Sequence, residues 1–155
     1  MNPTLFDPAQ FLDVETTDNA TKRPPLPVGD YTATVGEITC VPWQGRSDPS
    51  KSGLKYIVPL AIEVPPSIQQ DLGLTVPTIK LTDGIMLDVT EGGTLDYSPG
   101  RNGSLRRYRE ALDMNKKGEV FSARKMTGRL LLVKLTHEIY NGEIQERVGG
   151  VARLP

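Results

Sequence analysis

The side chains that most often carry catalysis are scarce in this chain of 155 residues. Its only histidine, His137, lies in the string Leu-Thr-His-Glu-Ile-Tyr, near the end of an expected strand. A catalytic histidine needs a nucleophile or an orienting carboxylate, and Glu138 on a strand would point to the opposite face. The only cysteine, Cys40, has no histidine or cationic cluster near it in sequence to activate the thiol. We therefore expect no enzyme, and interpret His137 as a surface residue and Cys40 as a small buried hydrophobe.

The sequence also predicts neither a metal nor another cofactor. One cysteine excludes a disulfide framework and a cysteine-rich zinc site. The glycine-rich stretches lack the Gly-Lys-Ser/Thr ending of a nucleotide-binding loop. The carboxylates between residues 83 and 96 are scattered and lack the spacing of a calcium loop.

Charge is distributed unevenly along the chain, although the net charge is only −1. Residues 1–100 carry 6 basic and 13 acidic side chains, whereas residues 101–134 carry 10 basic and 3 acidic ones. Such a basic block attracts phosphates or an acidic protein face, and its alternative interpretation is a solvated helix with its loop. Arg101, Arg106 and Arg107 crowd an expected helix N-terminus, where the macrodipole disfavours cations. This predicts an anionic counterpart: phosphate, a carboxylate such as Asp96, or a neighbour's acidic arm.

Aromatic side chains near these cations are candidate platforms for stacked nucleic-acid bases. They are Trp43, Tyr56, Tyr97, Tyr108 and Tyr140, of which Tyr108 is expected on the core face of its helix. Trp43 lies in an expected first loop close to several cations. The candidate anion or nucleic-acid contacts are Trp43, Arg46, Lys55, Tyr56, Arg101, Arg106, Arg107, Lys116 and Lys117.

The elements that must position these residues are mainly strands. Apolar residues alternate over 31–41, with a bulge expected at Gly36, and strands are also expected over 54–64, 78–89, 130–137 and 144–151. Asp83-Gly84 could instead be a hairpin tip that divides the third strand. Ser67 is expected to cap a helical turn in the insertion 65–77, and residues 104–114 form the one convincing helix. Asn141-Gly142 predicts a hairpin. This order indicates a five-stranded OB-like barrel with one helix between strands 3 and 4 over residues 28–155, although a small β-sandwich reads similarly.

Residues 1–27 are expected to form an extended arm. Phe6, Phe11 and Leu12 make a small apolar group, and Asp7 with Pro8 predicts one or two helical turns. A polar stretch and a proline cluster follow. In isolation such a segment is disordered, so we expect either its own barrel or a neighbouring chain to hold it.

Localisation follows from what the sequence lacks. No apolar run approaches eighteen residues, which predicts no membrane span, and residues 1–10 do not read as a secretory signal. A lone cysteine suits a reducing cytoplasm, or a particle assembled there.

Four strings make the chain resemble a family of small tailed-bacteriophage proteins that look like single-stranded-DNA-binding OB proteins. The strings cover residues 25–31 (PLPVGDY), 51–54 (KSGL), 103–112 (GSLRRYREAL) and 128–134 (GRLLLVK). The resemblance spans about residues 24–153, and the arm is similar to those of some phage members. It implies a phage origin and an OB-like barrel. The strings are turn and core signatures, so they carry over no functional residue.

Two functions remain open. The first is an auxiliary virion protein, such as a capsid decoration or cement protein. It would assemble in the host cytoplasm through the arm and barrel surface, with other phage structural proteins or copies of itself as partners. The alternative is a phage single-stranded-DNA-binding protein of replication or recombination. Near-neutral charge, 6% aromatic content and the lack of an acidic C-terminal tail favour the first. Convergence of the aromatics and the basic block on one groove would favour the second.

Overall fold

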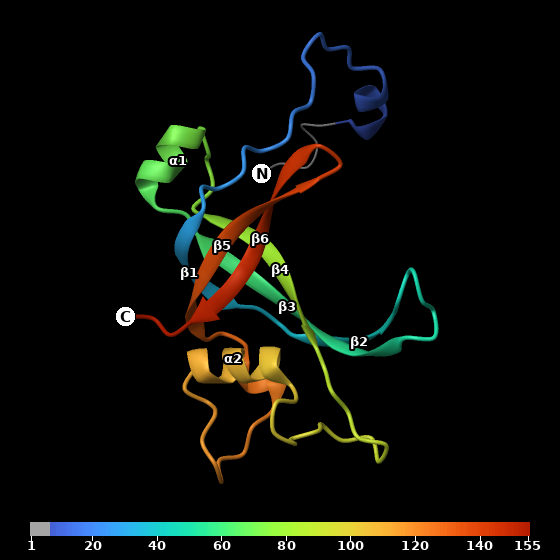
Figure 1. Cartoon of the computed structure of the whole chain (residues 1–155). Helices are drawn as coiled ribbons and strands as arrows, with labels where there is room; N and C mark the ends of the chain where they lie inside the picture. The colour runs from blue at the N-terminus through green and yellow to red at the C-terminus, as the bar shows by residue number, and fades with distance from the viewer. Residues whose placement is uncertain (1–6) are drawn as a thin grey trace.

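The computed structural model describes residues 7–155 and is mainly β, with one sheet of six antiparallel strands and two α-helices (Figure 1). Short 3₁₀ helices occupy Pro8–Leu12 and Ala123–Met126. The helices are α1 (Pro66–Leu72) and α2 (Gly103–Ala111). The strands are β1 (Gly29–Val35), β2 (Thr39–Gln44), β3 (Ser52–Glu63), β4 (Thr78–Met86), β5 (Leu130–Tyr140) and β6 (Glu143–Ala152).

The sheet is open, so the expected barrel is not closed. Strand β3 lies at its centre: β4 pairs along one edge, while β2 and β1 pair with successive parts of the other edge. Strand β1 continues to β5, and β5 to β6. No ladder joins β4 to β6 within the described residues.

The prediction of five strands is wrong by one, because the expected first strand is divided into β1 and β2. Val35 pairs with Leu60, and the next ladder begins with Thr39 opposite Ile57. Residues 36–38 therefore lie opposite residues 58–59. The one extra residue is that of a β-bulge, and it lies at the predicted position, Gly36. Pro59 lies opposite this break and has no N–H to donate.

The core lies between the sheet and α2. Every second residue is buried along β1, in the second half of β3 and in the first half of β5, which is the alternation expected of a half-buried sheet. Helix α2 buries Leu105, Tyr108 and Ala111, the face predicted from its spacing. The Tyr108 hydroxyl donates to Asp83 Oδ2 at 2.6 Å and attaches the helix to β4. Burial, followed by the adjacent Asp83 charge, raises the pKa of Tyr108 well above its ordinary value.

Turn chemistry explains most element ends. Asn141 and Gly142 have φ of 51° and 77° and form the predicted hairpin between β5 and β6. Strand β4 runs unbroken through Asp83-Gly84, so the alternative of a hairpin there is wrong. Helix α1 begins directly after Pro65, so the expected cap at Ser67 is also wrong: proline at the first helical position already lacks an N–H to satisfy.

The molecule's own sheet holds the root of the arm, which we define as residues 22–27. Arg23 Nη1 donates to Glu146 Oε2 at 3.1 Å, and the Leu26 N–H donates to the same oxygen at 2.8 Å. His137 Nε2 lies 2.6 Å from the Leu26 carbonyl oxygen, and the Leu26 side chain is fully buried. Of the two expected holders of the arm, it is therefore the molecule's own sheet that holds the arm root. His137 contributes to this contact through the Leu26 carbonyl oxygen.

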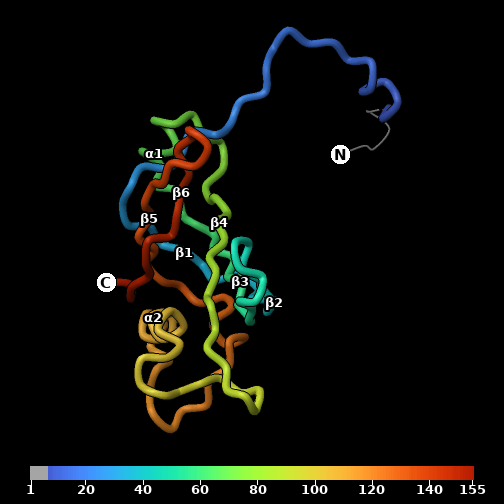
Figure 2. The backbone as a smooth tube through the Cα atoms, turned by 45° about the vertical axis from the view of Figure 1, so that its right-hand side comes forward, coloured from blue at the N-terminus to red at the C-terminus, as the bar shows by residue number. Residues whose placement is uncertain are grey.

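The distal arm, residues 7–21, extends away from the sheet at the end opposite α2 (Figures 1 and 2). Every residue in it is exposed, including Leu12, which is 87% exposed. The predicted helical turn is present as the 3₁₀ helix that Asp7 caps, and Phe11 lies within it. Phe6, the third member of the predicted apolar group, lies outside the described residues.

We expect Glu146→Ala to loosen the arm root. The change leaves the buried Leu26 N–H without its acceptor and removes the partner of Arg23, a combined loss of about 2 kcal/mol in unfolding free energy. Urea denaturation and hydrogen exchange of the Leu26 amide measure it. Glu143→Ala is the matched control, because its pair with Lys22 is solvent-exposed and contributes little. We call the contacts of Glu146 and His137 with the arm root the clamp. Equal effects of the two changes would contradict its role.

Candidate nucleic-acid interface

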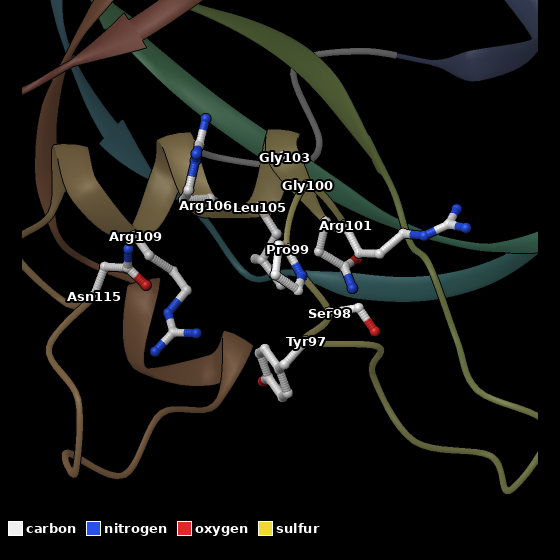
Figure 3. A pocket seen from close by; sticks show the side chains of 11 residues that line it. Tyr97, Ser98, Pro99, Gly100, Arg101, Gly103, Leu105, Arg106, Arg109 and Asn115 are labelled. Atoms are coloured by element: carbon white, nitrogen blue, oxygen red, sulfur yellow. The ribbon is translucent and has the colours of Figure 1, made fainter.

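Two hollows that share lining residues lie beside α2, on the side of the helix that faces away from the sheet. Figure 3 shows the residues that line the first of them. The first has a volume of about 390 Å³ and lies between residues 97–103, the outer side of α2 and Asn115. The second, of about 560 Å³, is lined by residues 115–119 and Phe121. Tyr97, Arg109 and Asn115 line both. We call the lining of the two hollows the α2-end surface.

Asn102 fastens the loop before α2 to the helix. It is 4% exposed and has a left-handed backbone with φ of 51°, a conformation that asparagine tolerates better than most residues. Its Oδ1 accepts from the Asp88 N–H at 2.9 Å, and its Nδ2 donates to the carbonyl oxygens of Asp88 and Asp96, each at 2.9 Å. Its own N–H donates to Asp88 Oδ2 at 2.7 Å. Asn102 therefore holds the loop that carries Tyr97 at two points, Asp88 and Asp96.

Tyr97 presents an exposed ring where the two hollows meet, with 67% of the residue accessible to solvent. Tyr56 is half-buried, and burial raises its pKa, with further contributions from Cys40 and Tyr97. Tyr56 and Cys40 are cross-strand partners in the β2–β3 ladder. The prediction that Cys40 is buried is wrong, because it lies on the part of β2 that extends beyond the core.

Arg109 is the cation that points into the shared space toward Tyr97 (Figure 3). Its Nε donates to the Met114 carbonyl oxygen at 3.1 Å, and its guanidinium carbon lies 4.1 Å from the centre of the Phe121 ring. These contacts hold the side chain in place through a cation–π interaction and a hydrogen bond. Arg109 is not among the contacts predicted from the sequence. The signal that could have found it is its position four residues after Leu105, which places it one helical turn further along α2.

Several of the predicted cations form weak ion pairs with nearby carboxylates. Arg101 lies 3.9 Å from both Asp88 and Asp96. Hydrogen bonds from Ser98, and then Arg101, lower the pKa of Asp96. Asp96 is thus one of the counterparts expected for the arginines at this helix N-terminus. Two further pairs, Arg106–Glu110 at 3.8 Å and Lys116–Asp113 at 3.4 Å, are also solvent-exposed.

Two of the predicted cations within residues 101–117 have no such partner. Arg107 and Lys117 form no ion pair within residues 7–155. Lys117 lines the second hollow, and Arg107 lies on the neighbouring side of α2 that faces β6. Figure 3 shows Arg101 and Arg106 pointing away from the shared space. Of the predicted cations, Arg101, Arg106, Lys116 and Lys117 therefore line the α2-end surface, and Arg107 lies next to it.

The remaining predicted contacts lie elsewhere. Trp43 pairs with Gly53 on β3, and successive residues of a strand alternate between faces, so Trp43 and Lys55 lie on the opposite face from Tyr56. A Cβ at Gly53 would lie 2.8 Å from Trp43 Nε1, so the indole packs directly on the glycine. Arg46 lies in the turn between β2 and β3. Trp43 and Tyr56 therefore do not converge on one groove with the α2 cations, whereas Tyr97 does lie with Arg109, Lys116 and Lys117 in the lining of the two hollows.

In the part of the chain that the structure describes, no three histidine, cysteine or acidic side chains are close enough to hold a metal ion. No helix within residues 7–155 has the length and apolar character needed to cross a bilayer.

Comparison with known proteins finds no matching family model and no similar curated protein.

Proposed function

We propose that this protein binds single-stranded nucleic acid through the α2-end surface. One observation carries the proposal: an exposed aromatic ring, Tyr97, lies at the junction of two hollows whose lining includes Arg109, Lys116 and Lys117. Proteins that bind single strands without sequence preference combine a cationic groove with aromatic side chains on which bases stack. Phosphates would contact the lysines and arginines, while an unpaired base would stack on Tyr97.

The local charge supports phosphate binding despite the near-neutral chain. Residues 101–117 contain six cations and two carboxylates. The ion pairs made by Arg101, Arg106 and Lys116 are long and exposed, and such pairs contribute little to stability. These cations can therefore exchange a carboxylate for a phosphate at small cost, and Arg107 and Lys117 have no carboxylate partner within residues 7–155 to exchange.

The strand order supports the same proposal. If β1 and β2 are taken as one strand bent at Gly36, five strands with α2 between the third and fourth reproduce the order of an OB-fold. OB-folds are partly open barrels, and many bind oligonucleotides. We propose that this sheet is an open OB-like barrel, in agreement with the resemblance to single-stranded-DNA-binding phage proteins.

Titration of a fluorescent single-stranded oligonucleotide tests the proposal. We expect binding whose logarithm falls with the logarithm of salt concentration with a slope of about −3, as expected for four to five phosphate contacts on a single strand. Tyr97→Ala should weaken binding by about tenfold or more through lost stacking, whereas Tyr97→Phe should retain it. Absence of binding at low salt, or equal affinities for the Ala and Phe variants, would contradict this site.

The distal arm favours a second candidate, an auxiliary virion protein such as a capsid decoration protein. Leu12 is 87% and Val14 is 61% exposed, on a segment that the clamp at Glu146 holds away from the sheet. Exposed apolar residues on an anchored arm suit docking onto another chain. The presence of the protein in purified particles would support this function, and its absence there would leave the nucleic-acid proposal alone.

A further inference from the structure

The distal arm is an acidic segment. Residues 7–21 contain Asp7, Asp13, Glu15 and Asp18 and no lysine or arginine, a net charge of −4. None of these four carboxylates forms an ion pair within the described residues, and all four residues are exposed. The arm also carries apolar groups between its charges, with Leu12 and Val14 the clearest examples.

The α2-end surface has the complementary character. Residues 101–117 have a net charge of +4, opposite and equal to that of the distal arm. Apolar side chains lie beside these cations: Tyr97, which is 67% exposed, lines both hollows, and Phe121 lines the second. The distal arm, in which carboxylates lie between apolar residues, is therefore complementary to this surface in charge and matches it in apolar character.

The geometry of the arm directs it toward another molecule. The clamp at Glu146 and His137 fixes the arm root at the end of the sheet opposite α2, and the chain then leads further away (Figures 1 and 2). To reach its own α2, the arm would have to turn back along the whole sheet. A second copy of the chain can present its α2 end to the arm without such a reversal.

We propose that the distal arm of one molecule docks on the α2-end surface of a second copy, with Asp13, Glu15 and Asp18 in the place of phosphates. This deepens the proposed function, on which its regulatory part rests, because the arm would then compete with nucleic acid for the same cations. Free protein would self-associate at low salt, and an oligonucleotide would release the arms.

Sedimentation velocity of full-length protein at low and high salt tests the self-association. The arm variant D13N/E15Q/D18N neutralises three exposed side chains and leaves the clamp intact. The control variant E37Q/E63Q/D71N removes the same charge from three exposed residues that form no ion pair in the structure. We expect the wild type and the control to associate at low salt, and the arm variant to associate at least tenfold more weakly.

Mixing variants identifies the two partners of the contact. A surface variant, R106Q/R107Q/K117Q, keeps its arm but loses cations, so it should associate weakly alone and form dimers with the arm variant. Monomers at every concentration and salt, or equal association of the arm variant and the control, would overturn the proposal.

Oligonucleotide titration separates this proposal from the function it rests on. If competition occurs, the arm variant binds the oligonucleotide severalfold more tightly than the control. Arm-dependent association without any oligonucleotide binding would disprove the nucleic-acid function and leave self-assembly standing. Oligonucleotide binding that is equal in the two variants, with no association, would do the reverse.

Discussion

Neutralising Arg106, Arg107 and Lys117 together should lower affinity for a single-stranded oligonucleotide by roughly 100-fold at about 50 mM salt. Each cation that contacts a phosphate releases counterions on binding, so the loss of three contacts should also reduce the salt slope by about 2. Glutamine preserves most of the side-chain length, and all three positions lie on exposed parts of α2 or the loop that follows it. Fluorescence anisotropy at several salt concentrations measures both quantities.

A matched control places the binding surface. Lys80, Arg129 and Lys134 are exposed and make no ion pair in the described part of the chain. Replacing these three with glutamine removes the same charge from the sheet and the start of β5, and should change affinity by only a few-fold. If this control loses more affinity than the α2 variant, the nucleic acid binds on the sheet near Lys80 instead.

Asn102→Ala should lower the free energy of unfolding by about 4 kcal/mol. The substitution removes three side-chain hydrogen bonds that join Asp88 and Asp96 to the helix, each contributing about 1 kcal/mol, and leaves the half-buried Asp88 N–H without its acceptor. It also places alanine in the left-handed region, at a further cost of about 1 kcal/mol. Chemical denaturation and hydrogen exchange of the Asp88 amide measure the effect.

Two comparisons separate these causes. Asn102→Gly removes the same hydrogen bonds but accommodates the positive φ, so we expect it to recover about 1 kcal/mol relative to alanine. Asn141 has the same φ of 51°, but it lies in an exposed hairpin turn, so Asn141→Ala should cost only the conformational part. An Asn102→Ala variant no less stable than Asn141→Ala would contradict the role of Asn102 as a fastener.

The loss of the Asn102 hydrogen bonds should also change the α2-end surface. The loop from Asp88 to Asn102 carries Tyr97 and Arg101, and its attachment to α2 determines where the Tyr97 ring lies. We therefore expect Asn102→Ala to weaken oligonucleotide binding under conditions in which the protein remains folded. Unchanged affinity would place Tyr97 outside the binding surface.

Local patterns in the sequence were sufficient to predict most of the elements. Alternation in β1 and β5, the helical spacing of Leu105 and Tyr108, and the Asn141-Gly142 turn all depend on neighbouring residues, so they could be interpreted without the fold. The boundaries that were missed depend on partners. Whether Gly36 bends one strand or divides two is decided by Pro59 across the ladder, which lies 23 positions further along the chain.

The candidate site shows the same division. Composition alone located the basic block and the acidic arm, because charge is a property of each residue and not of its surroundings. Which aromatic ring the cations meet was decided by the tertiary structure. Asn102 brings the Tyr97 loop against α2, the alternation of β2 and β3 sends Trp43 and Tyr56 to opposite faces, and Glu146 holds the arm root far from α2. These contacts join residues from different elements, and no local pattern contains them.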